Sequence, residues 1–460
     1  MPSDFTFAVI VLVIGISMYG LMKLVHGTKV KNKSFNYKND VAEIASNRPF
    51  KGKKPVGEVT LLGQLGNKKY VFIKNDAKHI FVCGTTGSGK TVVLANFIKA
   101  CAEYNYPMLI VDGKGDPDAG SMLEITKQLC SNRKKYIINL NDPKNSDKYN
   151  PFKNTNTDVI KDMLINMTNW SEEHYKYNTE RYIQRLCKLL AMQNIIVSLE
   201  SLTKYLPTAN FTKLSKDLSG KGLISKDDHL ENMEIAKISG SIAESAAARF
   251  ATIKESDLGQ IFDESGIDIY TALNENAIII FILNPLLYPE MSPLIGNLII
   301  IDSKKAVSNF YQNKKNRIFY LFDEINVYAS PNLLDLVNKS RSANITCILA
   351  TQSLSDLDKV TPEFKNQIIE NCNNYIVLRN NSPDNAEYWA NTIGTVPAMQ
   401  ATYQVKSDSG EAQSTDLGSL RKTREYLYHP DEIKNLPTGT AIFVSRDEMF
   451  HTKIKVNKPF

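Results

Sequence analysis

The sequence predicts an α/β protein with a mostly parallel sheet covered by helices, an all-α insertion, and an N-terminal transmembrane helix. Three observations support this fold class. Short, entirely apolar runs recur between helical stretches, which is typical of parallel strands buried on both faces. A long stretch without such runs separates two groups of them, and one uncharged segment lies near the start. A chain of 460 residues has room for about two or three folded units.

The first segment, Phe5 to Met22, is uncharged over its whole length. As a helix it would span roughly 27 Å, which is just enough to cross a bilayer. No basic residue precedes it and no A-x-A cleavage site follows it, so an uncleaved anchor is favoured over a signal peptide or a core helix. Lysines follow it closely, so the positive-inside rule predicts a single-pass membrane protein with its N-terminus outside and its soluble domains cytoplasmic. We expect the anchor at 1–24 and a juxtamembrane linker at 25–55.

The apolar runs predict the strands of the sheet. They are Val59 to Leu62, Tyr70 to Ile73, His79 to Gly84, Met108 to Gly113, Tyr136 to Leu140, Ala277 to Leu283, Ile318 to Phe322, Ile345 to Ala350, Tyr375 to Leu378 and Ala441 to Val444. Between Asp158 and Phe262 the pattern is helical instead, as in Glu180 to Gln193 and Ala243 to Lys254. We therefore predict an α/β domain in two parts, 56–157 and 263–460, with an all-α insertion domain at 158–262.

Composition narrows the function classes without choosing one. The formal charge of +6 and the pI near 8.7 permit a nucleic-acid partner but do not require it. The six cysteines form no CxxC pair, which argues against a disulfide framework and a zinc site and favours a reducing compartment. The six histidines show no metal-ligand spacing, so we assign no transition metal.

The sequence GTTGSGKT fits the P-loop pattern GxxxxGK[ST], after an apolar strand and before an amphipathic helix. Glycines let backbone N–H groups wrap around phosphates at a helix N-terminus, where the helix dipole also favours negative charge. The lysine then reaches the β- and γ-phosphates, and the threonine hydroxyl can ligate Mg²⁺. The predicted nucleotide-binding residues are Gly84, Thr85, Thr86, Gly87, Ser88, Gly89, Lys90 and Thr91.

A second strand must supply a carboxylate for the metal, and the run IFYLFDE ends in two acids. We predict that Asp323 holds Mg²⁺, together with Thr91, and that Glu324 deprotonates the attacking water. Asp112, at the end of another apolar run, is the alternative metal ligand. The sequence NKS at Asn338 lacks the aspartate of a guanine-reading NKxD motif, which favours ATP over GTP.

Taken together, seven features of the sequence resemble the type IV secretion coupling proteins, the TraD/TraG-like conjugative DNA transfer ATPases. They are the N-terminal anchor and the segments GTTGSGKT, VDGKGD, YNPF, FDEINVYA, SRSANITCILATQSLSDL and REYLYHPDEIKNLPTGTAIFV. The resemblance implies a RecA-like P-loop NTPase domain that uses ATP and Mg²⁺. It also implies a location in the bacterial inner (cell) membrane, a membrane-distal all-α domain and a homohexameric ring. The implied function is transport of single-stranded DNA with a bound relaxase to a secretion channel.

The resemblance assigns roles to two further residues. By its position in the motifs, Gln352 would contact the γ-phosphate region, and Arg341 would act as an arginine finger on the neighbouring subunit's ATP. The bare sequence instead indicates a surface charge at Arg341 and a polar strand cap at Gln352. Relatives often carry two transmembrane helices and some carry a long acidic tail, whereas this sequence predicts one helix and ends shortly after the last predicted strand, at Phe460.

We therefore expect the insertion to recognise the substrate. Its candidate DNA-lining residues are Lys161, Tyr175, Lys176, Arg181 and Arg185. Two alternative functions remain at this point. One is another ring motor of the FtsK or HerA type, and the other is a nucleotide-dependent scaffold or an exporter of protein effectors. Glu324 favours hydrolysis over a passive scaffold, but the nucleotide site does not identify the cargo.

Overall fold

The computed structural model describes residues 57–66, 69–76, 78–118, 120–166, 173–313, 317–408 and 411–460. The predicted membrane segment, Phe5 to Met22, lies outside these ranges. Across the ranges given, none of the helices is both long and apolar enough to span a bilayer. The chain divides into two compact units, of which the larger comprises Phe50–Ala386 and Asp431–Phe460 and the other includes Glu387–Pro430.

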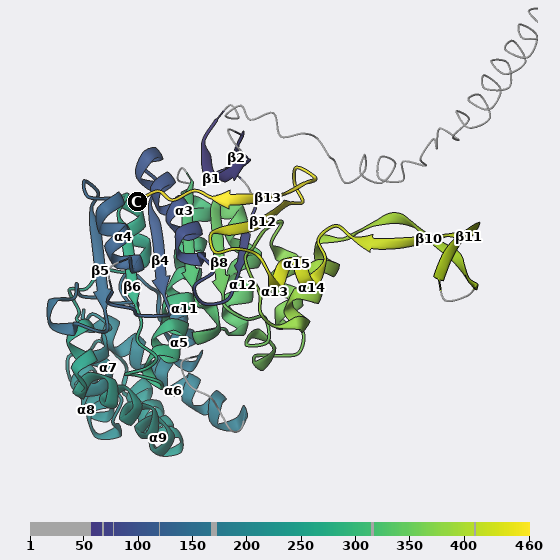
Figure 1. Ribbon diagram of the computed structural model, residues 1–460. Coiled ribbons are helices and arrows are strands. Elements are labelled where there is room, and N and C mark those ends of the chain that lie inside the picture. The colour runs from purple at the N-terminus through teal and green to yellow at the C-terminus, as the bar shows by residue number, and fades with distance from the viewer. Residues whose placement is uncertain are drawn as a thin grey trace, which may run out of the picture. The chain divides into compact units, whose positions relative to one another are not determined.

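The larger unit is built on one sheet, which has eleven strands within the described residues (Figure 1). Its spatial order is β2-β1-β13-β12-β9-β3-β8-β7-β4-β6-β5. The strands are β1 (Val59–Leu65), β2 (Lys69–Lys74), β3 (Ile80–Cys83), β4 (Met108–Asp112), β5 (Lys135–Asn139), β6 (Ile278–Ile282), β7 (Ile318–Asp323), β8 (Ile345–Thr351), β9 (Asn374–Val377), β12 (Thr440–Ser445) and β13 (Phe450–Val456). Every strand that the apolar runs predicted is confirmed.

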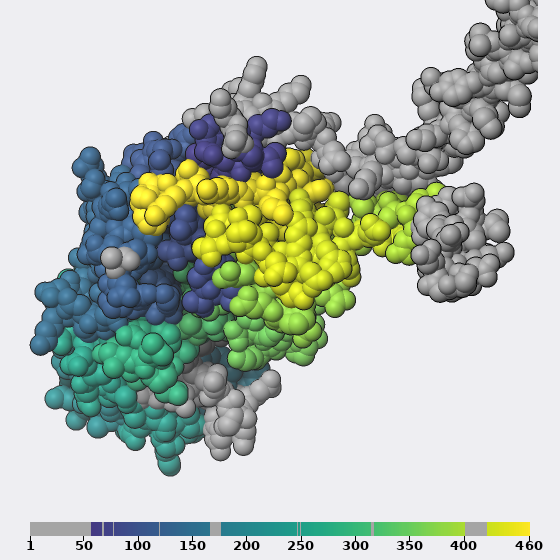
Figure 2. Space-filling view, viewed as in Figure 1, coloured from purple at the N-terminus to yellow at the C-terminus, as the bar shows by residue number. Residues whose placement is uncertain are grey.

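The sheet is parallel from β9 to β5 and antiparallel from β12 to β2. The parallel strands are buried along most of their length, as expected when both faces are covered. In the antiparallel part, β13 pairs with both β1 and β12, so the two ends of the described chain lie side by side (Figure 2). Sequence analysis missed β13, because its apolar run is interrupted by two exposed lysines, Lys453 and Lys455.

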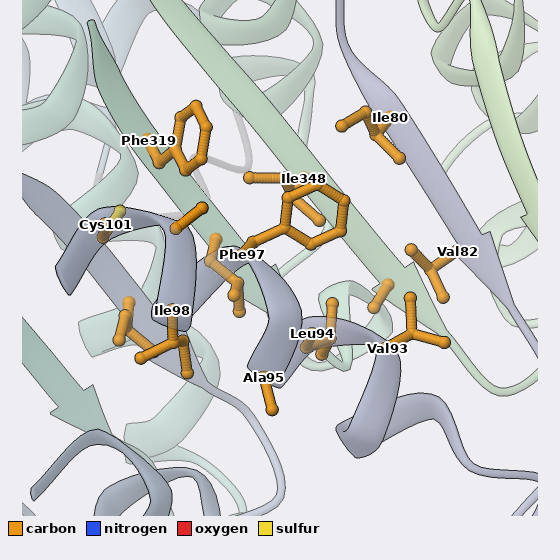
Figure 3. Packing of buried hydrophobic residues seen from close by; sticks show 14 of the residues in the cluster. Ile80, Val82, Val93, Leu94, Ala95, Phe97, Ile98, Cys101, Phe319 and Ile348 are labelled. Atoms are coloured by element: carbon orange, nitrogen blue, oxygen red, sulfur yellow. The ribbon is translucent and has the colours of Figure 1, made fainter. Parts of the chain in front are cut away.

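Helices cover the sheet, and α3 forms the main contact on one face. Its apolar positions recur at helical spacing, and Val93 and Phe97 face Val82 and Ile348 of the strands (Figure 3). The α3 helix runs over Lys90–Tyr104. The other helices that cover the two faces of the sheet are α4 (Met122–Leu129), α10 (Ile269–Asn274), α11 (Met291–Gln312), α12 (Pro331–Ser340), α13 (Phe364–Asn371) and α15 (Pro430–Lys434). Short 3₁₀ turns are η1 (Pro143–Asn145), η2 (Asp257–Ile261), η3 (Ile325–Val327), η4 (Arg341–Ala343) and η5 (Leu357–Lys359).

Five helices occupy the described residues of the stretch where the strand pattern is interrupted. They are α5 (Thr157–Asn166), α6 (Glu173–Met192), α7 (Leu199–Tyr205), α8 (Thr208–Gly220) and α9 (Lys226–Glu255). These helices share a hydrophobic core, which continues onto Leu298 and Ile301 of α11. The helical region therefore packs directly on a helix of the α/β part.

A buried ionic cluster holds the chain where it leaves and re-enters the α/β part. The Nζ atom of Lys305, on α11, lies 2.8 Å from Oδ1 of Asp302 and 3.3 Å from Oδ2 of Asp268. It also donates to the carbonyl of Pro151, and Tyr149 donates to Asp302 at 2.9 Å. All three charged side chains are almost fully buried. The YNPF sequence thus fastens the outgoing segment to α11, which sequence reasoning did not foresee.

The smaller unit contains a hairpin of two long strands, β10 (Thr395–Asp408) and β11 (Glu411–Tyr426). Their register runs from Thr395 opposite Tyr426 to Asp408 opposite Glu411, with one shift between Tyr403 and Val405. Most of α14 (Pro383–Ile393) precedes the hairpin in this unit. Sequence analysis assigned no structure here, although the Ser-Gly dipeptide between the two runs is a turn signal.

His79 fixes the start of the P-loop strand. Its Nδ1 atom accepts a hydrogen bond from the backbone N–H of Cys347 at 3.0 Å. Burial lowers the pKa of this imidazole to about 4. Between this value and the ordinary value near 6.5, the unfolded chain binds a proton that the folded chain does not, so acidification destabilises the fold.

We expect the free energy of unfolding to fall as the pH drops from 6.5 towards 4. Replacing His79 with Gln, which can still accept the Cys347 hydrogen bond, should flatten this dependence. Denaturant midpoints at about pH 7.5 and about pH 5 measure it. An equally steep loss in the Gln variant would show that other groups cause the acid sensitivity.

Candidate nucleotide-binding site

The P-loop lies between the end of β3 and the start of α3, as the motif predicts. Gly87 and Gly89 have φ angles of 73° and 107°, which side-chain-bearing residues rarely adopt. The loop is fastened to the sheet, because the Thr85 N–H donates to the carbonyl of Arg379 at 2.9 Å and the Gly84 N–H donates to that of Thr351 at 3.3 Å. The α3 N-terminus, with Thr91 in its first turn, faces the same edge of the sheet.

The two acids predicted at the end of the run IFYLFDE lie at this edge as well, because β7 is the second strand from β3. Asp323 ends β7 in register with Asp112 of β4, and both side chains are buried. Glu324 follows in the left-handed region, with φ 49° and ψ 54°. A non-glycine residue in this conformation carries a strain of about 1–3 kcal/mol, and such strain clusters at functional sites. A Cβ atom on Gly113 would lie 2.9 Å from the Glu324 carbonyl, so glycine there leaves room for the turn.

Lys90 is the cation of the site. Its Nζ atom lies 2.5 Å from Oε1 of Glu324 and 3.8 Å from Oδ1 of Asp323, and all three side chains are over 90% buried. Burial raises the pKa of Asp323 to about 7, against the opposing effect of Lys90. The charges of Glu324 and Asp112 contribute to this raised pKa of Asp323. Two carboxyl groups beside one ammonium, with Asp112 next to Asp323, make a site that favours additional positive charge.

The side chain of Asp112, the alternative metal ligand, accepts hydrogen bonds within the turn that follows β4. Its Oδ1 atom accepts from the N–H groups of Lys114 at 2.9 Å and Gly115 at 3.3 Å. Burial raises its pKa, while these two backbone donors lower it. Asp112 therefore shapes the edge of the site and adds negative charge beside Asp323.

Gln352 joins the P-loop to the acidic strand. The Thr86 hydroxyl donates to Oε1 of Gln352 at 2.6 Å, and Nε2 of Gln352 donates to Oε1 of Glu324 at 2.6 Å. Glu324 thus accepts from both Lys90 and Gln352. The resemblance had placed Gln352 at the phosphates, whereas the bare sequence had suggested only a strand cap.

Arg341 does not lie at the nucleotide-binding site of its own chain. It is exposed and opens η4, before the amino end of β8, whereas the P-loop and Gln352 lie at the carboxyl ends of the parallel strands. The structure therefore does not bring Arg341 to the P-loop of the same subunit.

Several residues around the P-loop escaped sequence reasoning. The Thr438 hydroxyl donates to the Gly87 carbonyl at 3.3 Å, and the Gly439 N–H donates to the Ser88 carbonyl at 2.9 Å. Asn381 donates to the Thr85 hydroxyl at 3.5 Å. The Pro-Thr-Gly sequence indicates a turn, but no sequence pattern places this turn beside the P-loop, which lies about 350 positions earlier.

The chemistry of these groups fits a nucleoside triphosphate with Mg²⁺. The glycine-rich loop opens a helix, the buried lysine is within reach of the loop, and the Ser88 hydroxyl is buried without a protein partner. No cluster of three or more His, Cys, Asp or Glu ligands is found in the described part of the chain. A Mg²⁺ ion held by one or two protein oxygens and phosphates needs no such cluster.

The candidate DNA-lining residues of the helical region are largely paired. Arg181 lies 2.8 Å from Glu231, Arg185 forms an ion pair with the same carboxylate, and Lys161 lies 2.8 Å from Asp162. Their charges are thus partly neutralised within the region, which weakens their case as phosphate contacts.

Residues 71–457 match the family described as the type IV secretion-system coupling protein DNA-binding domain. The chain belongs to this family. The match covers most of the chain and confirms the resemblance that the motifs indicated.

Solved structures with the same fold include members of this family. The bacterial conjugative coupling protein TrwBdeltaN70 is 18% identical, with a TM-score of 0.62 over 88% of this chain and 90% of that one. The plasmid coupling protein TrwB in complex with ADP and Mg²⁺ is 17% identical, with a TM-score of 0.58 over 89% and 91%. VirB4 of Thermoanaerobacter pseudethanolicus is 10% identical, with a TM-score of 0.52 over 88% and 97%. These likenesses show a shared fold, that of the RecA-like coupling proteins.

Two curated relatives come from Mycoplasma pneumoniae, and both are uncharacterised. One is 31% identical over 93 residues, or 16% of this chain and 78% of that protein. The other is 30% identical over 101 residues, or 22% of this chain and 67% of that protein.

Proposed function

We propose that this coupling protein is an ATP-driven motor that moves single-stranded DNA, or DNA with a bound relaxase, to a type IV secretion channel during conjugation. The observation that carries the proposal is the meeting of Lys90, Glu324 and Gln352 at the carboxyl edge of the sheet. A passive nucleotide-binding site needs the lysine but has no use for a buried glutamate aimed at the same point. Membership of a DNA-binding coupling family supports DNA as the cargo.

In the proposed reaction, P-loop N–H groups and Lys90 hold the phosphates of ATP. The oxygen of a water molecule attacks the γ-phosphorus, Glu324 accepts a proton from that water, and the bond to the β-phosphate oxygen breaks. Lys90 must exchange its ion pair with Glu324 for the phosphates, which leaves the carboxylate free to act as a base. Gln352 keeps Glu324 oriented during this exchange and contacts the γ-phosphate region.

Thr91 and Asp323 would hold Mg²⁺, which supplies neutralisation of the phosphate charge when bound. The complexes of TrwB with ADP and Mg²⁺, and with an ATP analogue, support ATP and Mg²⁺ as the ligands here. The raised pKa of Asp323 shows that Lys90 alone does not offset the burial of this carboxyl group, and a bound cation in addition to Lys90 would do so.

We also propose the assembly that the family resemblance implied. Arg341 would stabilise the ATP of the neighbouring subunit in a homohexamer, which agrees with its distance from the P-loop of its own chain. Residues 1–24 would anchor the protein in the inner membrane, with 25–55 as a linker. Residues 56–157 and 263–460 would form the motor domain, and 158–262 the all-α domain that receives the substrate.

The test is the ATPase activity of the full chain with and without single-stranded DNA, alongside Lys90→Ala. We expect DNA to stimulate ATP turnover several-fold, and the variant to lose nucleotide binding and turnover because the buried cation of the site is removed. Gel filtration or mass photometry of both proteins should first establish that they form the same oligomer.

Slow turnover that ignores DNA would contradict the DNA motor. Together with intact ATP binding, it would favour the alternative of a nucleotide-dependent scaffold or an exporter of protein effectors. The FtsK- and HerA-type alternatives are disfavoured by the family match.

A further inference from the structure

Two lysines approach the acid pair of the site, Asp323 and Glu324, and the proposed reaction uses only one of them. Lys90 comes from the P-loop, which follows β3. Lys114 comes from the loop that follows β4, and β4 pairs with β7 on the side away from β8 and β3. Along this edge of the sheet, the acid pair therefore lies between the two lysines.

The backbone of Lys114 is fixed beside the acid pair. The N–H of Gly113 donates to the carbonyl of Asp323 at 3.2 Å. A Cβ atom on Gly115 would lie 1.8 Å from the carbonyl of Leu283, so only glycine lets the loop pack this closely on the end of β6. The loop thus holds the start of the Lys114 side chain in one place relative to the acids.

The side chain of Lys114 is less firmly held than its backbone. Its ammonium group forms an ion pair with Asp116, and the side chain is 52% exposed. An ion pair this exposed contributes at most about 1 kcal/mol, so a stronger anion can displace Asp116. The hydrogen bond to Asp116 raises the pKa of Lys114, and the charges of Asp112 and Asp323 raise it as well. The ammonium group is therefore charged and lies within electrostatic range of the site.

The products of hydrolysis give this cation a task. Cleavage leaves ADP in the P-loop with Lys90, and it turns the terminal phosphate into a separate anion beside Glu324. The carboxyl groups of Asp323 and Glu324 repel that anion, while Lys90 stays with the phosphates of ADP. Lys114 offers a positive charge on the far side of the acid pair.

The spacing of the strands separates Lys114 from ATP itself. β4 is the third strand from β3, which corresponds to about 14 Å at the usual spacing of about 4.8 Å. Phosphates that are still part of ATP stay with the P-loop, whereas a free phosphate can move past the acid pair. We propose that Lys114 binds the inorganic phosphate that hydrolysis releases, an inference that rests on the proposed function.

The experiment measures the affinity for inorganic phosphate when ADP already fills the site. Phosphorus NMR follows inorganic phosphate as it is titrated into the full chain with excess ADP and Mg²⁺. We expect Lys114→Met to weaken phosphate binding about tenfold, the lower end of the range for a hydrogen bond to a charged group. Binding of ADP and of a non-hydrolysable ATP analogue, measured by calorimetry, should change by less than about twofold, because neither reaches Lys114.

The two partners of the ion pair give a direct comparison. Asp116→Asn breaks the ion pair as Lys114→Met does, but it removes an anion and leaves the ammonium group unpaired. The amide oxygen can still accept from the N–H of Asp118. Phosphate binding should therefore become about two- to threefold stronger, since the competing carboxylate is gone. If the ion pair only stabilised the loop, both variants would weaken phosphate binding.

Two further variants serve as controls. Lys127, on α4, also forms a local ion pair, with Glu124 at 2.9 Å, and is 45% exposed. Lys127→Met makes the same chemical change outside the loop and should bind phosphate like the wild type. Lys114→Arg keeps the charge and should retain most of the phosphate affinity.

The outcomes separate this inference from the proposed function. Unchanged phosphate binding in Lys114→Met, or weaker binding in both Lys114→Met and Asp116→Asn, would overturn the inference and leave the motor intact. Equal losses for phosphate and for the ATP analogue would also overturn it, because Lys114 would then act on the bound triphosphate. If the wild type binds neither nucleotide, the proposed function itself fails.

Discussion

Replacement of Glu324 by glutamine is expected to lower ATP turnover by about 10²–10⁴-fold while ATP still binds. The amide keeps the size of the side chain and can still accept from Gln352 and Lys90, but it cannot take a proton from water. The loss should appear in kcat and not in the affinity for ATP, because Glu324 acts on the attacking water. Steady-state ATPase assays and equilibrium nucleotide binding measure the two quantities separately.

A glutamate elsewhere provides the matched control. Glu370 is exposed at the end of α13, and Glu370→Gln makes the same chemical change away from the site. It should leave turnover unaltered. A Glu324→Gln variant that hydrolyses ATP within about threefold of the wild type would remove the general base from the mechanism and point to another carboxylate, with Asp112 the nearest to examine.

Replacement of Lys305 by methionine is expected to destabilise the larger unit by about 3–5 kcal/mol. The substitution keeps most of the side-chain volume but leaves Asp302 and Asp268 as buried carboxylates without their cation. It also removes the donor that holds the Pro151 carbonyl. Chemical denaturation, followed by tryptophan fluorescence and circular dichroism, measures the change.

The neighbouring lysine is a built-in control. Lys304 forms an ion pair with Asp335 at 3.1 Å, but its side chain is 30% exposed, so Lys304→Met should cost below about 1 kcal/mol. The double variant Lys305→Met with Asp302→Asn should regain part of the loss, because the amide oxygen still accepts from Tyr149 and one buried charge is gone. Equal denaturation midpoints for Lys304→Met and Lys305→Met would refute the role of the cluster.

The parallel part of the fold and the core of the site were predictable, because both leave strong local marks. Buried strands are continuous apolar runs, and the P-loop needs its glycines, lysine and threonine at fixed spacing. The end of β7 is similar, since a carboxylate pair after a buried strand has few structural uses. Gln352 needed the family resemblance, because a single glutamine after a strand has no local signature.

The remaining features depend on contacts between distant segments. Thr438 and Gly439 meet the P-loop only because β12 joins the same sheet as β3, and no local pattern records that pairing. In the sequence Lys305 is an ordinary helical lysine. Its role depends on Asp268, which lies beside it only because the chain after the helical region packs against α11. The hairpin of β10 and β11 has polar runs, so its strands lacked the apolar signal on which the other predictions relied.

The position of β13 has a consequence for biosynthesis. This last strand lies between β1 and β12, and Asn457, just beyond it, bonds to Asn96 of the P-loop helix. During synthesis this part of the sheet cannot close until β13 has left the ribosome, because β1 waits for a partner nearly 400 positions away. A product that terminates before β13 would lack that partner and leave the edge of β1 unpaired. The support that Asn457 gives to the P-loop helix is thereby available only once β13 has been made.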